Sequence, residues 1–334
     1  MLAWVVAEPG RFGDGAAPLV AVDRGIPEPG PGEVRLRVSA CGVCRTDLHL
    51  AEGDLRPRRA NTVPGHEIVG YVDAIGPGAH RFQGGERAGI AWLRATCGHC
   101  CWCTTGHENI CPDAQFTGWD ADGGYAEYAV VDERYAYLIP DVFDDEQAAP
   151  LLCAGIIGYR ALSLANLPKN GRLGIYGFGG SAHIAAQIAI WQGATVHVLT
   201  RSAEARRLAL ELGAASAGDA YAQPPEKLDA AILFAPVGEL VPVALQALGR
   251  GGTLAIAGIH LSAIPALDYQ RHLFGERALR SVTANTRADG EEFLSAAALA
   301  GVHVTTVTYP LKAADAALAD LAADRVTGAA VLTV

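Results

Sequence analysis

Apolar and polar positions alternate over short segments in roughly the first 150 residues. Residues 33–39 are an example, because every second position carries valine or leucine. Such alternation is typical of a half-buried strand. Turns rich in glycine and proline separate these segments, at 29–32, 76–78 and 84–85. The pattern predicts a β-rich, barrel-like structure for this part of the chain.

The pattern changes after residue 155, where apolar strands alternate with amphipathic helices. Strands are expected at 172–176, 194–199, 228–234 and 252–257, and helices at 181–192 and 203–212. This alternation predicts a doubly wound parallel sheet, so the fold class is α/β plus a β-rich domain. A last strand is expected at 329–334.

Composition narrows the classes of function. The chain has 334 residues, half of them apolar, and a formal net charge of −10. An acidic chain without a basic run argues against nucleic acid or an anionic membrane as the main partner. No apolar run reaches the roughly 18 residues of a membrane span. The N-terminus lacks a basic leader, so we expect no signal peptide and a cytoplasmic protein. Because the cytoplasm is reducing, the eight cysteines favour metal binding over disulfides.

Four cysteines lie close together with the spacing C-x2-C-x2-C-x7-C. They are Cys97, Cys100, Cys103 and Cys111. Four thiolates close a tetrahedron around zinc and leave no open position, which predicts a structural zinc lobe at 95–112. Cys101 is surplus by spacing, and His99 and His107 are alternative ligands that the four thiolates make unnecessary.

The segment Cys44-Arg45-Thr46-Asp47-Leu48-His49 concentrates reactive groups. A thiolate binds zinc, a hydroxyl and an imidazole pass protons, and an arginine holds a phosphate. Because the segment follows the expected strand 33–39, we predict that it lies in a turn. His66 and Cys153 could join Cys44 in a zinc site with three protein ligands and one open position. From sequence separation alone, ordinary core residues are an equally good interpretation.

A glycine-rich turn follows the expected strand 172–176. It is formed by Gly177, Phe178, Gly179, Gly180, Ser181 and Ala182. The pattern G-x-G-x-x-A between a strand and a helix predicts a dinucleotide site, with a packing turn as the alternative. The next strand ends at Thr200-Arg201-Ser202, without the acidic residue that binds a ribose 2′-hydroxyl. Arg201 could instead pair with a 2′-phosphate, so NADP(H) is favoured. If Arg201 is only a solvated residue, NAD(H) is the cofactor.

Five motifs occur in order: residues 41–49, 64–67, the four-cysteine lobe, 122–128 and 153–155. Together with the glycine-rich turn, they resemble the zinc-dependent alcohol dehydrogenases of the medium-chain dehydrogenase/reductase superfamily. The resemblance implies a GroES-like β-barrel catalytic domain, residues 1–153 and 286–334, and a Rossmann coenzyme domain, residues 154–285. It also implies two zinc ions per chain and hydride transfer between an alcohol and a nicotinamide cofactor.

The resemblance further implies roles for single residues. Cys44, His66 and Cys153 hold the catalytic zinc, and Cys41 is a buried residue that is not a ligand. Asp47 accepts a hydrogen bond from His66, and Glu67 can approach the metal. Thr46 takes the proton of the alcohol, His49 hands it to water, and Arg45 holds the pyrophosphate.

Three positions depart from many relatives of this type: Leu55 where several have tryptophan, Ile157 where many have threonine, and Ala329 where many have arginine. The last removes one expected phosphate contact. Leu55 suggests a roomy substrate pocket, which Trp92 and Trp119 would line. We therefore expect primary medium-chain or aromatic alcohols and aldehydes as substrates. A homodimer or homotetramer is expected by analogy.

Two other classes remain open at this stage. A non-catalytic zinc protein could bind nucleotide as a sensor or scaffold on the same fold. A zinc-free quinone or enoyl reductase would share the scaffold, but such enzymes lack the four-cysteine lobe. Metal content distinguishes these classes.

Overall fold

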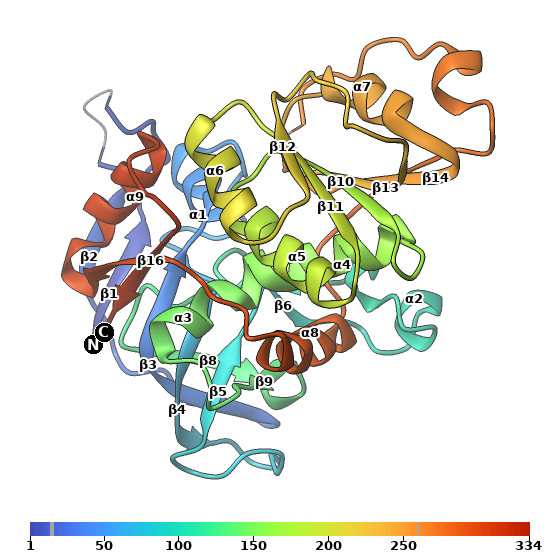
Figure 1. The fold of residues 1–334 in the computed structure, drawn as a ribbon. Coiled ribbons are helices and arrows are strands. Elements are labelled where there is room, and N and C mark those ends of the chain that lie inside the picture. Colours follow the sequence, from blue (N-terminus) through green and yellow to red (C-terminus); the bar gives the residue numbers. More distant parts are fainter. Residues whose placement is uncertain (14–16, 260) are drawn as a thin grey trace. The chain divides into compact units, whose positions relative to one another are not determined.

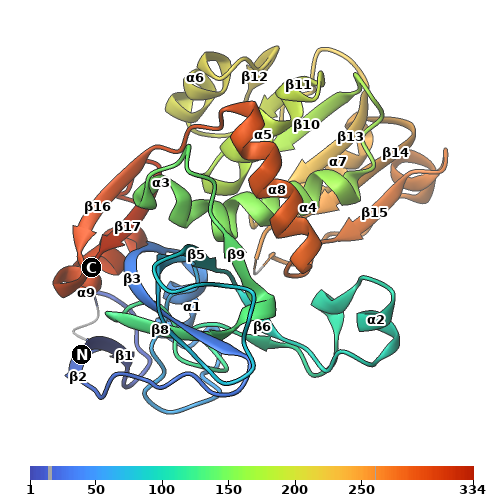
Figure 2. The ribbon, with the colours of Figure 1, turned by 90° about the horizontal axis from the view of Figure 1, so that it is seen from below.

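The computed structural model describes residues 1–13, 17–259 and 261–334. It divides into two compact units. The first comprises Met1–Cys153, Ala284–Ala298 and His303–Val334, and the second comprises Ala154–Thr283 and Leu299–Val302. Figure 1 and Figure 2 show the elements of both units in two orientations.

The first unit is β-rich. Its main sheet has the order β16 (Thr306–Pro310), β17 (Ala329–Thr333), β3 (Glu33–Val43), β4 (Ile68–Ile75), β5 (Arg87–Ile90) and β9 (Ala136–Leu138), and β8 (Tyr128–Asp132) also pairs with β3. Two smaller antiparallel pairs are β1 (Leu2–Val6) with β2 (Leu19–Asp23), and β6 (Leu93–Ala95) with β7 (Gln115–Phe116). The helices are α1 (Arg45–Glu52), α2 (Cys101–Thr104), α3 (Asp145–Pro150), α9 (Ala314–Ala322) and most of α8 (Arg287–Ala300), with short turns η1 (Glu108–Ile110), η2 (Glu133–Tyr135) and η5 (Leu311–Ala313).

The central strand of this sheet, β3, is longer than the sequence pattern predicts. Every second residue of this strand is buried up to residue 39, and all residues from Ala40 to Val43 are buried. Helix α1 begins directly afterwards, with Cys44 as its N-cap residue, and ends at Gly53 in the left-handed conformation (φ 88°). The prediction of a turn at residues 44–49 is therefore wrong, since these residues form the start of a helix.

The second unit is a six-stranded parallel sheet. Its order is β12 (Ser216–Gly218), β11 (Thr195–Leu199), β10 (Arg172–Tyr176), β13 (Leu228–Leu233), β14 (Leu248–Ile256) and β15 (Ala278–Ser281). The helices are α4 (Ile156–Ala165), α5 (Gly180–Trp191), α6 (Ala203–Glu211) and α7 (Leu240–Ala247), with a π-turn η4 (Tyr269–Leu273). Strands β10, β11 and β13 are almost entirely buried, as expected for a parallel sheet covered on both faces. The strand order turns back between β10 and β13, the position at which such sheets bind ligands.

A continuous helical run, Asp145–Ala165, joins α3, a π-turn η3 (Leu151–Gly155) and α4. By length and composition alone it could cross a bilayer, but most of its apolar stretch is buried inside the molecule. The run also contains Asp145, Pro150 and Arg160. These features are typical of the core helix of a globular protein.

Candidate active site and metal centres

Cys44, His66, Glu67 and Cys153 lie together in the first unit. Each offers one ligand atom, and these atoms lie within 4.8 Å of one another. The sulfur atoms of Cys44 and Cys153 are 3.9 Å apart, close to the edge of about 3.8 Å for a tetrahedron with zinc–sulfur bonds of about 2.3 Å. His66 Nε2 is buried and has no hydrogen-bond partner in the described part of the chain. Two soft thiolates and an imidazole whose buried Nε2 lacks a partner among the described residues fit a zinc ion.

Each of these residues is placed by a local feature of the backbone. Cys44 caps α1 directly after β3, and Cys153 lies in the π-turn η3 after Pro150. His66 follows Gly65, whose φ is +96°. A Cβ atom on Gly65 would lie 2.5 Å from the Tyr125 ring and 2.8 Å from the sulfur of Cys41. Only glycine therefore fits beside His66.

Asp47 connects the segments that carry Cys44 and His66. Its Oδ1 accepts hydrogen bonds from the Gly65 amide at 3.0 Å and from His66 Nδ1 at 3.2 Å. Its Oδ2 accepts one from the Cys44 amide at 2.9 Å, and the Tyr125 hydroxyl lies 3.4 Å away. Since Asp47 is 2% exposed, these bonds are shielded from water. They hold the imidazole with its proton on Nδ1 and leave Nε2 available to a metal.

The ionisable groups of this site influence one another. A hydrogen bond from Cys153 lowers the pKa of the Cys44 thiol, and the same contact raises the pKa of Cys153. Burial opposes the protonation of His66, but the charge of Asp47 and its hydrogen bond raise the pKa of the imidazole. Burial raises the pKa of Glu67. A zinc ion held by these residues would have to displace the proton of Cys153, so its affinity would fall as the pH falls.

The remaining residues of the segment 44–49 lie on α1. Thr46 is buried, and its Oγ1 is 3.7 Å from the sulfur of Cys44. His49 is half-buried, with Nδ1 3.2 Å from Asp54 Oδ2. Arg45 is exposed and forms an ion pair with Asp324. Positions three residues apart lie on one face of a helix, so Thr46 and His49 share a face.

Aromatic rings extend from His66. The Trp92 ring meets the imidazole edge-on at 4.8 Å, and Trp92 stacks on Phe116 at 5.0 Å and on Trp119 at 6.0 Å. Leu55 is partly buried and packs against the core of this unit, as do Phe116 and Trp119. The Arg58 guanidinium lies 3.7 Å from the centre of the Trp119 ring. Sequence reasoning missed Phe116 and Arg58, because the spacing of single residues does not reveal stacking.

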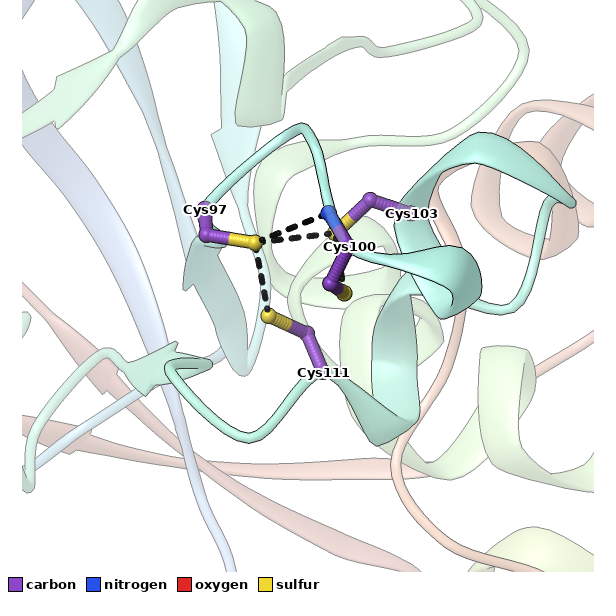
Figure 3. A group of neighbouring side chains, drawn as sticks. All are labelled: Cys97, Cys100, Cys103 and Cys111. Atoms are coloured by element: carbon purple, nitrogen blue, oxygen red, sulfur yellow. Dashed lines mark hydrogen bonds between the residues drawn. The ribbon is translucent and has the colours of Figure 1, made fainter.

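The four-cysteine lobe forms a second cluster, shown in Figure 3. Sulfur–sulfur distances are 3.9 Å for Cys97–Cys103, 3.6 Å for Cys100–Cys103 and 3.6 Å for Cys97–Cys111. All four sulfur atoms lie within 4.8 Å of one another, so they too fit a zinc ion. Backbone N–H groups of His99 and Cys100 lower the pKa of Cys97 to about 6. Cys101 is exposed, and neither it nor His99 or His107 belongs to this group of ligand atoms.

The glycine-rich turn lies between β10 and α5 in the second unit. Gly177 has φ +83°, and a Cβ atom there would lie 2.8 Å from the amide nitrogen of Ala235. A Cβ atom on Gly179 would meet nothing within 4 Å, so open space remains beside the backbone at the start of the helix. Phe178 and Ala182 are buried, and Gly180 and Ser181 form the first residues of α5. The arrangement fits a phosphate that accepts hydrogen bonds from the helix N-terminus.

The end of β11 bears on the choice of cofactor. Thr200 is buried, and Arg201 is exposed. Ser202 caps α6 by accepting a hydrogen bond from the Ala205 amide at 3.1 Å. Arg206, which the sequence did not single out, donates to the carbonyl groups of Thr200 at 2.7 Å and Arg201 at 3.0 Å. These hydrogen bonds from Arg206 fix the backbone that carries Arg201.

Two of the three positions that depart from many relatives, Ile157 and Ala329, lie in regular elements. Ile157 is half-buried in α4. Ala329 begins β17, where it pairs with Thr306 of β16. A methyl side chain on Ala329 cannot supply the phosphate contact of an arginine.

Comparison with known proteins identifies the family. Residues 30–141 match the family described as "Alcohol dehydrogenase GroES-like domain", and residues 180–299 match "Zinc-binding dehydrogenase". A probable alcohol dehydrogenase from Mycobacterium tuberculosis is 58% identical, and the alignment covers 100% of this chain and 97% of the relative. A cinnamyl alcohol dehydrogenase from Sorghum bicolor is 28% identical, with a TM-score of 0.87 and coverage of 99% and 97%. A Helicobacter pylori structure described as CAD complexed with NADP(H) is 25% identical, with a TM-score of 0.88 and coverage of 100% and 98%.

The fold is therefore a GroES-like domain with a Rossmann-like nucleotide-binding domain, as the sequence resemblance implied. The chain belongs to the zinc-dependent alcohol dehydrogenases of the medium-chain dehydrogenase/reductase superfamily, and it is an alcohol oxidoreductase.

Proposed function

We propose that the enzyme holds two zinc ions and interconverts primary medium-chain or aromatic alcohols with their aldehydes, using NADP(H). The observation that carries this proposal is the cluster of Cys44, His66 and Cys153, with His66 Nε2 buried and without a partner among the described residues. The second zinc ion belongs to Cys97, Cys100, Cys103 and Cys111. We also propose a cytosolic location, where a reducing environment keeps thiols available as metal ligands.

The chemistry is divided between the bound groups and the chain. When bound, zinc acts as a Lewis acid that lowers the pKa of an alcohol hydroxyl, and the nicotinamide exchanges hydride with the substrate carbon. Cys44, Cys153 and His66 hold the metal, and Asp47 orients His66 through the 3.2 Å contact. The buried carboxyl group of Glu67 belongs to the same group of ligand atoms and can approach the metal.

The proton route uses the helix α1. Thr46 is buried and its Oγ1 lies 3.7 Å from the sulfur of Cys44, so it accepts the substrate proton beside the metal ligands. His49 lies one helical turn further on and delivers the proton to water. The Arg45 guanidinium is exposed at the start of the same helix and binds the pyrophosphate of the cofactor.

Substrate size tests the proposed specificity. The stacked rings of Trp92 and Trp119 offer a flat apolar surface beside His66, and Leu55 is smaller than a tryptophan. We expect kcat/KM for benzyl alcohol and hexanol to exceed that for ethanol by about tenfold or more, since each buried methylene contributes about 0.8 kcal/mol. Steady-state kinetics on a sample with measured zinc content provide the comparison. A clear preference for ethanol contradicts the proposed substrate class.

Cofactor choice is tested at Arg201. A charge-assisted hydrogen bond to the 2′-phosphate contributes about 1.5–3 kcal/mol, so Arg201→Ala should raise the KM for NADPH by about 10- to 100-fold and change that for NADH little. Arg207→Ala is a matched control, because Arg207 is also exposed and pairs with Glu211 on α6. An equal loss for both cofactors removes the argument for NADP(H), and NAD(H) is then the cofactor.

The edge of the parallel sheet supports the proposed homodimer or homotetramer. Strand β15 pairs with β14 alone among the described strands, so one row of its backbone groups can pair with another chain. Ile264, Tyr269 and Phe274, which precede it in the chain, are exposed apolar residues. Light scattering should give two or four times the mass of one chain, and a monomer at micromolar concentration contradicts this assembly.

A further inference from the structure

A second carboxylate, Asp145, ties together the segments that carry the proposed metal ligands. Its Oδ2 accepts a hydrogen bond from the Ser39 hydroxyl, and the Tyr71 hydroxyl lies 3.5 Å from the same oxygen. Its Oδ1 accepts one from Arg87 Nε at 2.6 Å. The Asp145 side chain is 17% exposed and that of Arg87 is 15% exposed. The network is therefore largely shielded from solvent, where such bonds are strong.

Asp145 and its hydrogen-bond partners Ser39 and Tyr71 lie within eight residues of the proposed metal ligands in sequence. Ser39 lies on β3, five residues before Cys44, and Tyr71 lies on β4, five residues after His66. Asp145 is the first residue of α3, and the same helical run reaches Cys153 eight residues later. The strand that precedes Cys44, the strand that follows His66 and the helix that leads to Cys153 thus meet at one carboxylate.

The helical run needs such an anchor. Helix α3 has six residues, contains Pro150 and passes into the π-turn that carries Cys153. Pro150 supplies no amide hydrogen for the helix, and a π-turn changes the angular position of each residue that follows. Eight residues of helix span about 12 Å, so a small rotation of the first turn displaces the sulfur of Cys153.

We propose that Asp145 is a positioning residue that fixes the helical run of Cys153 against β3, the strand that precedes Cys44, and so sets the sulfur–sulfur distance of the catalytic zinc site. The Ser39–Asp145 hydrogen bond is the direct link, and the Arg87 ion pair holds the carboxylate in place. Arg87 Nη2 is buried without a hydrogen-bond partner in the described structure, so Asp145 is also the group that balances its charge. This inference rests on the proposed zinc site.

The test compares zinc release in Asp145→Asn, Ser39→Ala and Asp229→Asn. The control, Asp229, accepts hydrogen bonds from Arg172 at 2.7 and 2.9 Å, and this ion pair joins β10 to β13 in the other unit. Transfer of zinc to a chromophoric chelator is followed by absorbance in each full-length variant. Two zinc sites should give two kinetic phases of release. The phase that is missing in Cys44→Ser is assigned to the catalytic site. Melting temperature and kcat are measured on the same samples.

Partners that orient metal ligands contribute about 10- to 100-fold to metal affinity. Because Asp145 acts from further away, we expect release from the catalytic site to accelerate about tenfold in Asp145→Asn and about threefold in Ser39→Ala. Release from the four-cysteine site should be unchanged, and Ser39→Thr should restore the normal rate. Asp229→Asn should lower the melting temperature without changing either phase.

Three results overturn the proposal: wild-type catalytic release in Ser39→Ala, equal acceleration of both phases in Asp145→Asn, or acceleration by Asp229→Asn in proportion to its loss of stability. If Asp145→Asn does not fold, Ser39→Ala decides. If the unmodified protein shows no phase that depends on Cys44, the proposed zinc site itself is wrong, which is a different failure.

Discussion

Replacing Cys44 by serine is expected to lower kcat/KM by about a thousandfold or more while the protein stays folded. The thiolate is one of three ligands, and the bound metal stabilises developing charge by several kcal/mol, of which each 1.36 kcal/mol corresponds to a factor of ten. Folding should survive, since Cys44 caps α1 with its backbone held by Asp47 at 2.9 Å. Steady-state kinetics, zinc analysis and circular dichroism of the purified variant give the three readouts. One zinc ion should remain.

Cys41 provides the matched control. It lies three residues earlier, is fully buried, and is not part of the group of ligand atoms. Burial raises the pKa of its thiol, so it stays protonated. Cys41→Ala should keep both zinc ions and turnover within a few-fold, with a modest loss of stability of about 1 kcal/mol for the small cavity. Near-normal turnover in Cys44→Ser, or loss of the catalytic zinc in Cys41→Ala, contradicts the assigned ligand set.

Replacing Cys103 by serine should mainly reduce the stability of the protein, whereas Cys44→Ser should mainly reduce its activity. Its sulfur lies 3.6 Å from that of Cys100 and 3.9 Å from that of Cys97. The lobe has only short elements around these thiols, so its structure depends on the metal. Structural zinc contributes about 10–16 kcal/mol to the folding of small zinc domains, and loss of one ligand removes a large share of it. We expect the melting temperature to fall by roughly 5–10 °C.

Cys101 separates this effect from a general effect of removing a thiol in the lobe. Cys101 lies on α2 between two ligands, but it is exposed and outside the cluster. Differential scanning calorimetry of Cys101→Ser should give the wild-type melting temperature with two zinc ions. If Cys103→Ser also keeps both zinc ions and melts normally, the four thiols do not form a metal site.

Local signals in the sequence predicted much of the fold. The strand at 172–176 is predicted with its observed ends, and the helices at 181–192 and 203–212 agree with the observed ones to within one residue. These elements carry strong apolar periodicity, and turns mark their ends. The helix at 45–52 was missed, because its first turn is crowded with polar and charged residues that resemble a loop. Helices α4 and α7 were also not predicted, since short segments with few polar residues do not show a clear helical period.

The sequence by itself determined what depends on neighbours in the chain: the four-cysteine spacing, the glycine-rich turn and the absence of an acid after β11. Resemblance linked Cys44, His66 and Cys153, but spacing could not, because they are separated by up to 109 residues. Resemblance also linked Asp47 to His66. Only the tertiary structure decided that Asp145 joins segments distant in sequence. It also decided that Phe116 and Arg58 extend the rings beside His66 and that Arg206 braces the loop of Arg201. The physical reason is that side-chain hydrogen bonds and ring contacts depend on how strands and helices pack, and a single chain of residues does not encode those distances locally.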